Sequence, residues 1–238
     1  MAPLFFALHQ AIVATVSNTW DTSNSCGPND GCSGAVMVRK LNSSIKFPSG
    51  LTKTLTYSYQ SAVTGQISEI DETDYSTGTP PILRKTLYSY ATPANTVSKP
   101  SQVLVEDGSG NRVAQKNYNY DETQPTATSG VPQHNAVTGS RGNVTTMTQW
   151  VSATAGSLST TFTYDDTGNR LTATDPLHNV TTFSYADSFS DGVNRGTLAY
   201  LTQTTLPSTG SPAVSHIFKK QYQFDTGYAT GRDRQFRL

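Results

Sequence analysis

Residues 159–186 read STTFTYDDTGNRLTATDPLHNVTTFSYA, and this stretch decides the fold. Phe162 and Tyr164 alternate with threonines, which is the two-residue period of a strand with one half-buried face. Residues 165–168 read DDTG, a turn in which acidic side chains bond local amides. Gly168 can adopt a positive φ there because it has no Cβ to clash. The stretch therefore opens with a strand and a tight turn.

The next residues predict a return strand, a second turn and a third strand. The return strand, residues 169–174, alternates so that Leu171 lies on the opposite face from Arg170. Pro176 has no amide hydrogen, so it suits a turn and not a ladder. The third strand ends at Tyr185, in phase with the phenylalanine two places before it.

This stretch resembles the YD repeat of the RHS family. That repeat reads roughly Tyr-Asp-x-x-Gly-x-x-Leu, followed by a short strand, a turn and a strand that ends in an aromatic residue. Tyr164, Asp165, Gly168 and Leu171 match this pattern. Many repeats carry Gly-Arg, whereas Arg170 stands one place later here. The match is strong only in this stretch, so the resemblance also depends on looser copies elsewhere.

Similar aromatic strand endings recur at spacings of about 20 to 45 residues, within the range of repeat architectures. They stand at residues 57–59, 88–90, 118–121, 162–165, 183–185 and 222–225. In the last of them, Phe224-Asp225 followed by Gly227 is a degenerate copy of the Tyr-Asp-x-x-Gly turn. A glycine-rich turn at residues 107–111 between two alternating runs predicts a hairpin.

The resemblance implies an all-β fold, an antiparallel meander of repeated hairpins that forms an open, twisted sheet of RHS type, a partial shell. We expect this sheet at residues 45–230. Residues 1–44 are expected to be weakly structured, with a short N-terminal helix as one option. Residues 231–238 contain three arginines and no strand pattern, which predicts an irregular tail.

Loops and strands are also predicted between the aromatic endings. Clusters of Ser, Asn, Gly and Asp predict a loop at residues 17–34. A longer loop at 121–141 is expected to be an insertion between repeats. A short strand is expected at 35–40 and a longer one at 197–206.

The resemblance implies a function as well. RHS-type repeats wind into a hollow shell around a separate polypeptide cargo, often a toxin, in large bacterial proteins that are exported or displayed on the surface. A non-enzymatic structural fragment of such a protein is therefore expected, with further RHS repeats or an encapsulated polypeptide as partners. An extracellular or cell-surface location follows for the parent family. Residues 1–16 lack the basic start and the cleavage site of a signal peptide, and we expect a frame that ends abruptly.

The tyrosine rows admit a second function, a carbohydrate-binding or adhesion module. Exposed rings stack on sugars, and neighbouring Asn, Asp and Thr bond sugar hydroxyls. In the alternative interpretation the rings form the packed face of the sheet, in phase with Leu55, Leu87 and Leu171. The in-phase pattern favours the packed face.

Composition excludes several classes of protein. Only 14% of the 238 residues are charged and the formal net charge is zero, so no basic field draws the chain to nucleic acid or a membrane. No segment is long and apolar enough to predict membrane insertion. The hydrophobic content, 35%, is low, which leaves disorder as an alternative. Frequent aromatic alternation and low charge favour a folded chain.

No catalytic centre, cofactor or metal site is predicted. Cys26 and Cys32 are two thiols where zinc needs four ligands, and either a small disulfide loop or free thiols would fit them. The histidines are scattered. Asp165 and Asp166 resemble a glycosidase pair, but turn chemistry explains them better. The Asp-Pro step at residues 175–176 resembles a family self-cleavage step, but the glycine expected after it is absent.

Overall fold

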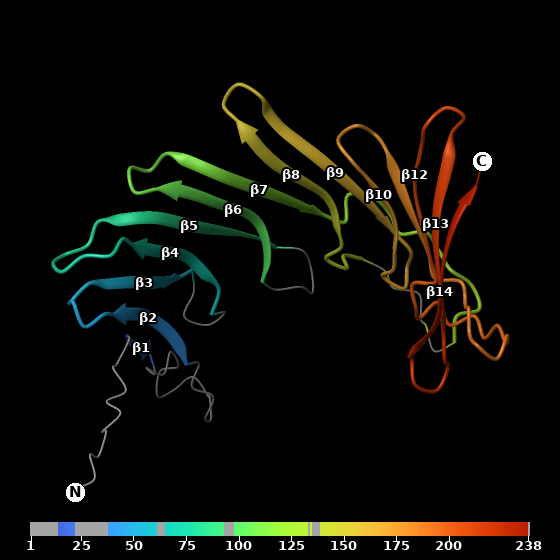
Figure 1. Cartoon of the computed structure of the whole chain (residues 1–238), viewed down its shortest axis with the longest axis horizontal. Helices are drawn as coiled ribbons and strands as arrows, with labels where there is room; N and C mark the ends of the chain where they lie inside the picture. The colour runs from blue at the N-terminus through green and yellow to red at the C-terminus, as the bar shows by residue number, and fades with distance from the viewer. Residues whose placement is uncertain are drawn as a thin grey trace, which may run out of the picture. The chain divides into compact units, whose positions relative to one another are not determined.

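The computed structural model consists entirely of β-strands and their connections. It describes residues 14–21, 38–60, 65–92, 98–132, 134 and 139–237, with side chains as far as Gly231. The strands form one open antiparallel sheet in the order of the sequence, from β1 to β14 (Figure 1). The predicted all-β meander is therefore confirmed. The N-terminal helix that we considered lies outside the described residues.

The fourteen strands are five to ten residues long. They are β1 (Thr15–Asp21), β2 (Arg39–Lys46), β3 (Thr52–Tyr59), β4 (Ile67–Thr73), β5 (Ile82–Ala91), β6 (Lys99–Asp107), β7 (Arg112–Tyr120), β8 (Val144–Ser152), β9 (Gly156–Tyr164), β10 (Arg170–Thr174), β11 (Val180–Ser184), β12 (Gln203–Thr209), β13 (Val214–Tyr222) and β14 (Ala229–Arg237).

The chain divides into two compact units, residues 1–89 with 102–115 and residues 90–101 with 116–238. In the first unit, ion pairs tie neighbouring strands together. Glu72 on β4 pairs with Lys53 on β3 and with Arg84 on β5. The hydrogen bond from Lys53 lowers the pKa of Glu72, which is only 9% exposed. Glu72 thus stays ionised and links three strands.

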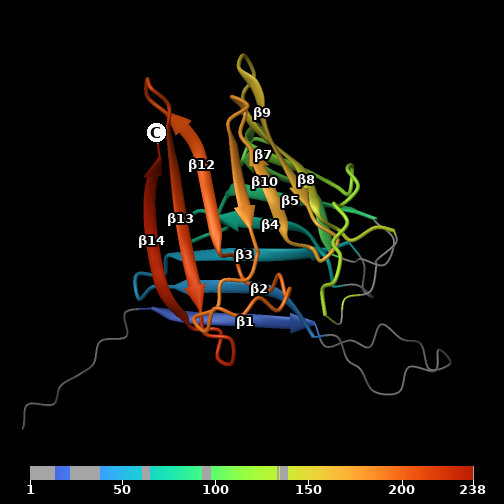
Figure 2. The ribbon, with the colours of Figure 1, turned by 90° about the vertical axis from the view of Figure 1, so that its right-hand side faces the viewer.

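In the second unit the two faces of the sheet differ in chemistry. Hydroxyl groups meet across strands on one face, as in Thr148 with Ser159 (2.9 Å) and Thr163 with Thr172 (2.7 Å). The opposite face, here called the aromatic face, carries Tyr118, Tyr120, Phe162, Tyr164 and Phe183. Figure 2 shows strands β12 to β14 of this unit side by side.

Few hydrophobic side chains are fully buried. Among the described residues, only Phe189 (3% exposed) and Ile217 (9%) are hydrophobic and buried. The rings of the aromatic face are half-buried, and their cross-strand neighbours include Met147 opposite Tyr118 and Arg170 opposite Tyr164. A favourable cross-strand pair of side chains contributes about 0.2–1 kcal/mol over a pair of alanines. Contacts between adjacent strands, and not a central core, therefore stabilise the sheet.

Three turns share one sequence pattern and one geometry. They are residues 107–111, 165–169 and 175–179, and each begins with Asp and ends with Asn. The Asp Oδ1 accepts the amides of the residues two and four places later. The fourth residue has a positive φ, namely Gly110 (83°), Gly168 (94°) and His178 (64°). The predicted turns are confirmed, and the acidic residues act as turn acceptors.

The N-terminal predictions need correction. Strand β1 starts before the loop predicted at residues 17–34 and occupies its first part. The short strand predicted at 35–40 overlaps β2 only at Arg39 and Lys40, and β2 continues to Lys46. The segment 1–44 is thus not weakly structured throughout. Serine and asparagine residues in these strands suggested a loop. Their backbone N–H and C=O groups nevertheless form hydrogen bonds with the neighbouring strand, as where Ser43 lies opposite Leu55.

Two C-terminal predictions are also wrong. Residues 231–237 of the predicted tail belong to β14, which pairs with β13. Backbone ladder bonds need no hydrophobic alternation, so composition did not reveal this strand. The strand predicted at 197–206 starts only at Gln203. The residues before Gln203 lie outside the strand, where the Thr197 amide and hydroxyl donate to the Asp187 carboxylate.

Gly168→Ala tests the shared turn. The added Cβ has room, since the nearest atom is Arg141 Nη2 at 3.7 Å, so the cost comes from the positive φ. We expect the free energy of unfolding to fall by about 1–2 kcal/mol, measured by urea denaturation. Gly78→Ala is the control, because it has no left-handed φ and its Cβ would meet no described atom within 4 Å. Equal losses in the two variants would contradict the turn assignment.

Candidate functional site

The second strand of each hairpin ends in tyrosine. The hairpins pair β2 with β3, β4 with β5, and so on to β12 with β13. Their second strands end within one residue of Tyr59, Tyr90, Tyr120, Tyr164, Tyr185 and Tyr222. Hydroxyl groups from this set donate to a backbone carbonyl within two residues of the start of the first strand: Tyr59 to Lys40 (2.8 Å), Tyr120 to Pro100 (2.7 Å), Tyr164 to Val144 (2.9 Å) and Tyr222 to Leu201 (3.1 Å).

We call this contact the tyrosine clamp. Donor and acceptor are 19 to 21 residues apart, because a hairpin brings the end of its second strand beside the start of its first. Burial raises the pKa of Tyr120 and Tyr164, which keeps the hydroxyls protonated as donors. Each clamp contributes about 0.5–1.5 kcal/mol net, as an ordinary hydrogen bond does.

The residue after each clamp tyrosine closes the loop to the next hairpin. Its amide donates to the carbonyl of a residue that follows a glycine of positive φ. The pairs are Gln60 to Gln66 (2.8 Å), Asp121 to Asn143 (3.0 Å), Asp165 to Asn169 (2.9 Å) and Gln223 to Tyr228 (2.8 Å), and the glycines are Gly65, Gly142, Gly168 and Gly227. The same closure therefore spans loops of very different length.

This closure places the C-terminal motif residues differently from the sequence prediction. Tyr222 and Gln223, not Phe224 and Asp225, stand where Tyr164-Asp165 stand in the central turn. Gly227 keeps the predicted role, with φ 69°. An added Cβ on Gly227 would lie 2.7 Å from the Tyr200 hydroxyl, so the Tyr200 side chain would have to shift to accommodate it.

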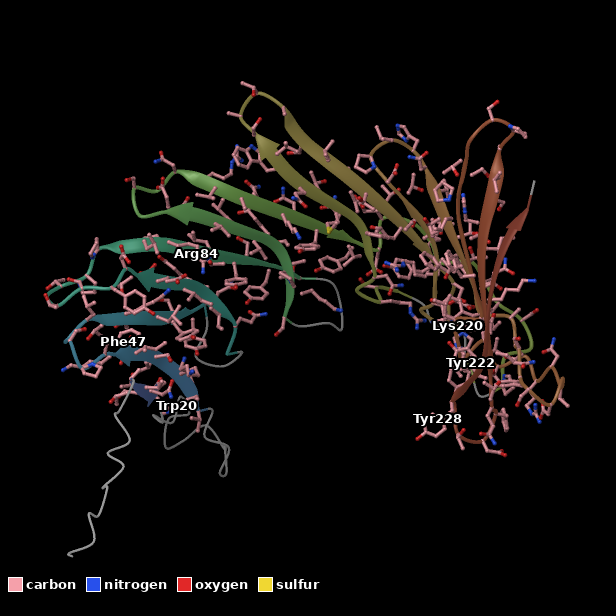
Figure 3. The ribbon with its side chains drawn as sticks, viewed as in Figure 1. Trp20, Phe47, Arg84, Lys220, Tyr222 and Tyr228 are labelled. Carbon is pink, nitrogen blue, oxygen red and sulfur yellow. The ribbon has the colours of Figure 1, made fainter. Side chains whose placement is uncertain are left out.

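Phe224 belongs instead to an aromatic cluster. It meets the Phe189 ring edge-on, with centroids 5.1 Å apart, and Tyr200 stacks on Tyr222 at 4.7 Å. The Arg195 guanidinium lies 4.1 Å from the Phe224 ring centre. Figure 3 labels Tyr222 and Tyr228 at this end of β13. Sequence reasoning missed the cluster because Phe189 and Arg195 lie in a stretch that reads as loop.

The predicted insertion at 121–141 has a structural role as a strap over the central turn. The Thr126 amide donates to the Tyr164 carbonyl (2.8 Å), and the Asp166 amide donates to the Thr126 carbonyl (2.9 Å). The Thr128 amide and hydroxyl then bond Asp166 Oδ1 at 3.1 and 2.5 Å. The strap thus fixes both the backbone and the second carboxylate of the turn.

Asp121 holds the two ends of the strap together. Its carboxylate accepts the Ser140 hydroxyl at 2.6 Å and the amides of Arg141, Gly142 and Asn143 at 3.0, 2.7 and 3.0 Å. Burial by itself would raise the pKa of Asp121, but these hydrogen bonds outweigh it and lower the pKa. The ionised carboxylate therefore stabilises the folded loop.

Three predicted residues meet at one hollow beside the central turn. Asp165, Leu171 and Tyr185 line a mostly apolar hollow of about 300 Å³ together with Thr126, Thr128, Phe183, Ser184, Ala186 and Leu198. Asp165 is only 4% exposed, and its Oδ1 accepts the Thr167 amide and hydroxyl and the Asn169 amide. The hollow therefore presents rings and aliphatic groups, while the carboxylate is engaged in the turn.

Arg170 lies on the aromatic face. The sequence pattern had predicted the opposite position, on the face that carries the threonines. A β-bulge between Arg170 and Thr172 breaks the regular alternation and sets Arg170 opposite Tyr164. Its guanidinium lies 5.4 Å from the ring centre of Phe162 and 4.7 Å from that of Phe183. The arginine therefore joins three strands through its contacts with aromatic rings.

The tyrosine rows are half-buried at Tyr57, Tyr90 and Tyr164, which is intermediate between the two predicted environments. Clamped hydroxyls are engaged with carbonyls, so a sugar would meet ring faces more than these donors. The predicted phase of Leu87 is wrong. Leu87 lies opposite Glu69 and next to Tyr88 in the chain, so it points to the other face.

The described residues contain neither a cluster of metal ligands nor a helix that could span a membrane. Within them, no group of three or more His, Cys, Asp and Glu side chains is placed to hold a metal ion. Cys26, Cys32 and His9 lie outside the described part of the chain. The described residues also contain no helix of the length and hydrophobicity needed to span a bilayer.

Comparison with known proteins adds no family assignment. No family model matches the chain, and no curated protein sequence matches it. The RHS resemblance therefore depends on the motif residues alone.

Tyr164→Phe tests the clamp. The substitution removes the hydroxyl and leaves the Val144 carbonyl without its donor. We expect the free energy of unfolding to fall by about 0.5–2 kcal/mol in urea denaturation. Tyr185→Phe is the matched control, because within the described residues its hydroxyl makes no such bond, and it should cost under about 0.5 kcal/mol. A larger loss in the control would argue against the clamp.

Asp121→Asn tests the strap through its pH dependence. The pKa of Asp121 is lowered on folding, so its stabilisation is present above its unfolded pKa of about 3.9 and is lost as the pH falls below that. We expect the variant to lose about 1–3 kcal/mol of unfolding free energy at neutral pH. The loss should shrink at acidic pH, where wild type is also protonated. Asp225→Asn, on an exposed residue, is the control, and an equal pH profile in both variants would contradict the assignment.

Proposed function

We propose that this chain is a non-enzymatic structural module of the RHS/YD-repeat type, a segment of a larger secreted or surface bacterial protein whose sheet encloses or displays a polypeptide. One observation carries the proposal. The tyrosine clamp and the closing amide bond recur from Tyr59 to Tyr222, whatever the length of the loop between hairpins. This recurrence defines a repeat by its hydrogen bonds even where the sequence copies are loose.

The repeat suits the building of a wall. A clamp stabilises the hairpins that end at Tyr59, Tyr120, Tyr164 and Tyr222, and each hairpin adds two strands to one side of the sheet. Loops between hairpins can vary in length without disturbing the ladder, as the strap at residues 121–143 shows. A structural shell needs this combination of a regular wall and variable connections, and a compact enzyme core does not.

The chemistry of the two faces favours a polypeptide partner on the aromatic face. Rings, Met147 and the Arg170 guanidinium offer apolar and cation–π contacts there, while the opposite face offers mainly hydroxyls. Aromatic rings and arginine are the residues that most often carry binding energy in protein interfaces. The half-buried rings gain most if a further polypeptide covers them.

The acidic residues support a structural role in place of catalysis. Asp107, Asp165 and Asp175 each accept two backbone amides of their own turn. These bonds explain why the residues stand where they do. Carbohydrate binding remains the second interpretation, and it would use ring faces, since the clamp hydroxyls are engaged.

Photo-crosslinking tests which face meets a polypeptide. A benzophenone amino acid would replace Tyr118 on the aromatic face or Asn117 on the other face, two adjacent residues that point to opposite sides. With a reduced and alkylated polypeptide as probe, we expect position 118 to give severalfold more crosslinked product, measured by gel and mass spectrometry. Equal yields, or none from 118, would overturn the proposed role of the aromatic face.

A further inference from the structure

The hollow beside the central turn is built from separate parts of the second unit. The strap, the central turn, strands β10 and β11 and the segment before β12 each supply part of its lining. The side chain of Thr128 in the strap bonds Asp166 in the turn, and the Asn169 side chain donates to the Leu198 carbonyl at 2.9 Å. These bonds join the walls to one another, so the hollow is a fixed feature of this unit.

The interior of the hollow is mostly apolar. Leu171, Phe183 and Leu198 give it aliphatic and aromatic surface. Asp165 also lines it, but this residue is only 4% exposed and its carboxylate accepts hydrogen bonds within its own turn. The volume of about 300 Å³ is at the small end of ligand pockets, which measure about 300–1,000 Å³. The hollow therefore suits one bulky apolar side chain and not a polymer.

Arg170 supplies a positive charge at the wall of this hollow. Its guanidinium lies 4.7 Å from the ring centre of Phe183, which is part of the lining. Arg170 is exposed, and among the described residues it forms no ion pair. A guanidinium binds a carboxylate through two parallel N–H···O bonds. An apolar hollow beside an unpaired arginine fits a ligand that joins an apolar group to a carboxylate.

We propose that the hollow and Arg170 bind the carboxyl-terminal residue of a polypeptide whose last side chain is bulky and apolar. The side chain fills the hollow, and the terminal carboxylate pairs with the guanidinium. A terminal residue suits the site because its side chain and its carboxylate are attached to the same Cα. In an extended segment, the carboxylate of an acidic residue next to an apolar one points to the opposite side.

This proposal gives the chemistry of the polypeptide partner proposed above, so it rests on that function. Arg170 and Phe183 belong to the aromatic face, and the hollow is where that face accepts a whole side chain. The two proposals can fail separately, because a crosslink at Tyr118 reports contact with the face and a titration of the hollow reports this one site.

Peptide titrations followed by the backbone amide signals of the full isotope-labelled chain in NMR spectra test the site. The probe is acetyl-Gly-Gly-Phe with a free carboxylate, and we expect it to shift the amide signals of Leu171, Ala186 and Leu198. The same peptide with a terminal amide should bind about two- to fivefold more weakly, the effect of an exposed ion pair. Acetyl-Gly-Gly-Ala, which leaves the hollow empty, should bind about tenfold more weakly or not at all.

Two variants locate the binding. Arg170→Gln should weaken the free acid about two- to fivefold and leave the terminal amide unchanged, whereas Arg112→Gln, an exposed arginine outside the lining, should change neither. Ala186→Phe places a ring in the hollow and should remove binding of both peptides. Ala155→Phe, at an exposed turn outside the lining, is its control. Circular dichroism melts establish that each variant is folded.

Several outcomes would overturn the proposal. One is a terminal amide that binds as tightly as the free acid, and another is binding that persists in folded Ala186→Phe. Tighter binding of acetyl-Gly-Phe-Glu-Gly-amide than of the free acid would show that the carboxylate comes from an internal acidic residue. If no peptide binds although position 118 crosslinks, the site is refuted and the proposed function stands.

Discussion

A hydrogen bond from a tyrosine hydroxyl to a carbonyl some twenty residues earlier recurs in four hairpins of this sheet and stabilises each of them. The need for it follows from the lack of buried core, since only Phe189 and Ile217 are buried hydrophobic residues in the described chain. A hairpin without a covering layer is marginally stable. The clamp joins the end of the second strand to the start of the first, at the end of the hairpin opposite its turn.

The clamp also explains the polar chemistry of the loops. Because Tyr164 fixes the end of β9, the residue after it is free to close the next loop, and Asp165 does so with both its amide and its carboxylate. Asp121 performs the same task across a much longer segment. The carboxylates of Asp121 and Asp165 thus accept backbone amides, and for Asp121 these bonds lower the pKa.

The lack of a covering layer also leaves one face of the sheet with partly exposed aromatic rings. The rings of the aromatic face are half-buried, and a polypeptide laid over them would bury the remainder.

The sequence by itself determined the strands and turns of residues 159–186 and the hairpin around residues 107–111, because a two-residue period and a glycine of positive φ are local properties. Only the tertiary structure decided the positions of Arg170 and Tyr222, the strap over Asp166, and strands β1 and β14. Those features depend on a bulge, on carbonyl acceptors and on ladder partners. Any residue type supplies a carbonyl or an extended backbone, so the sequence carries no mark of them.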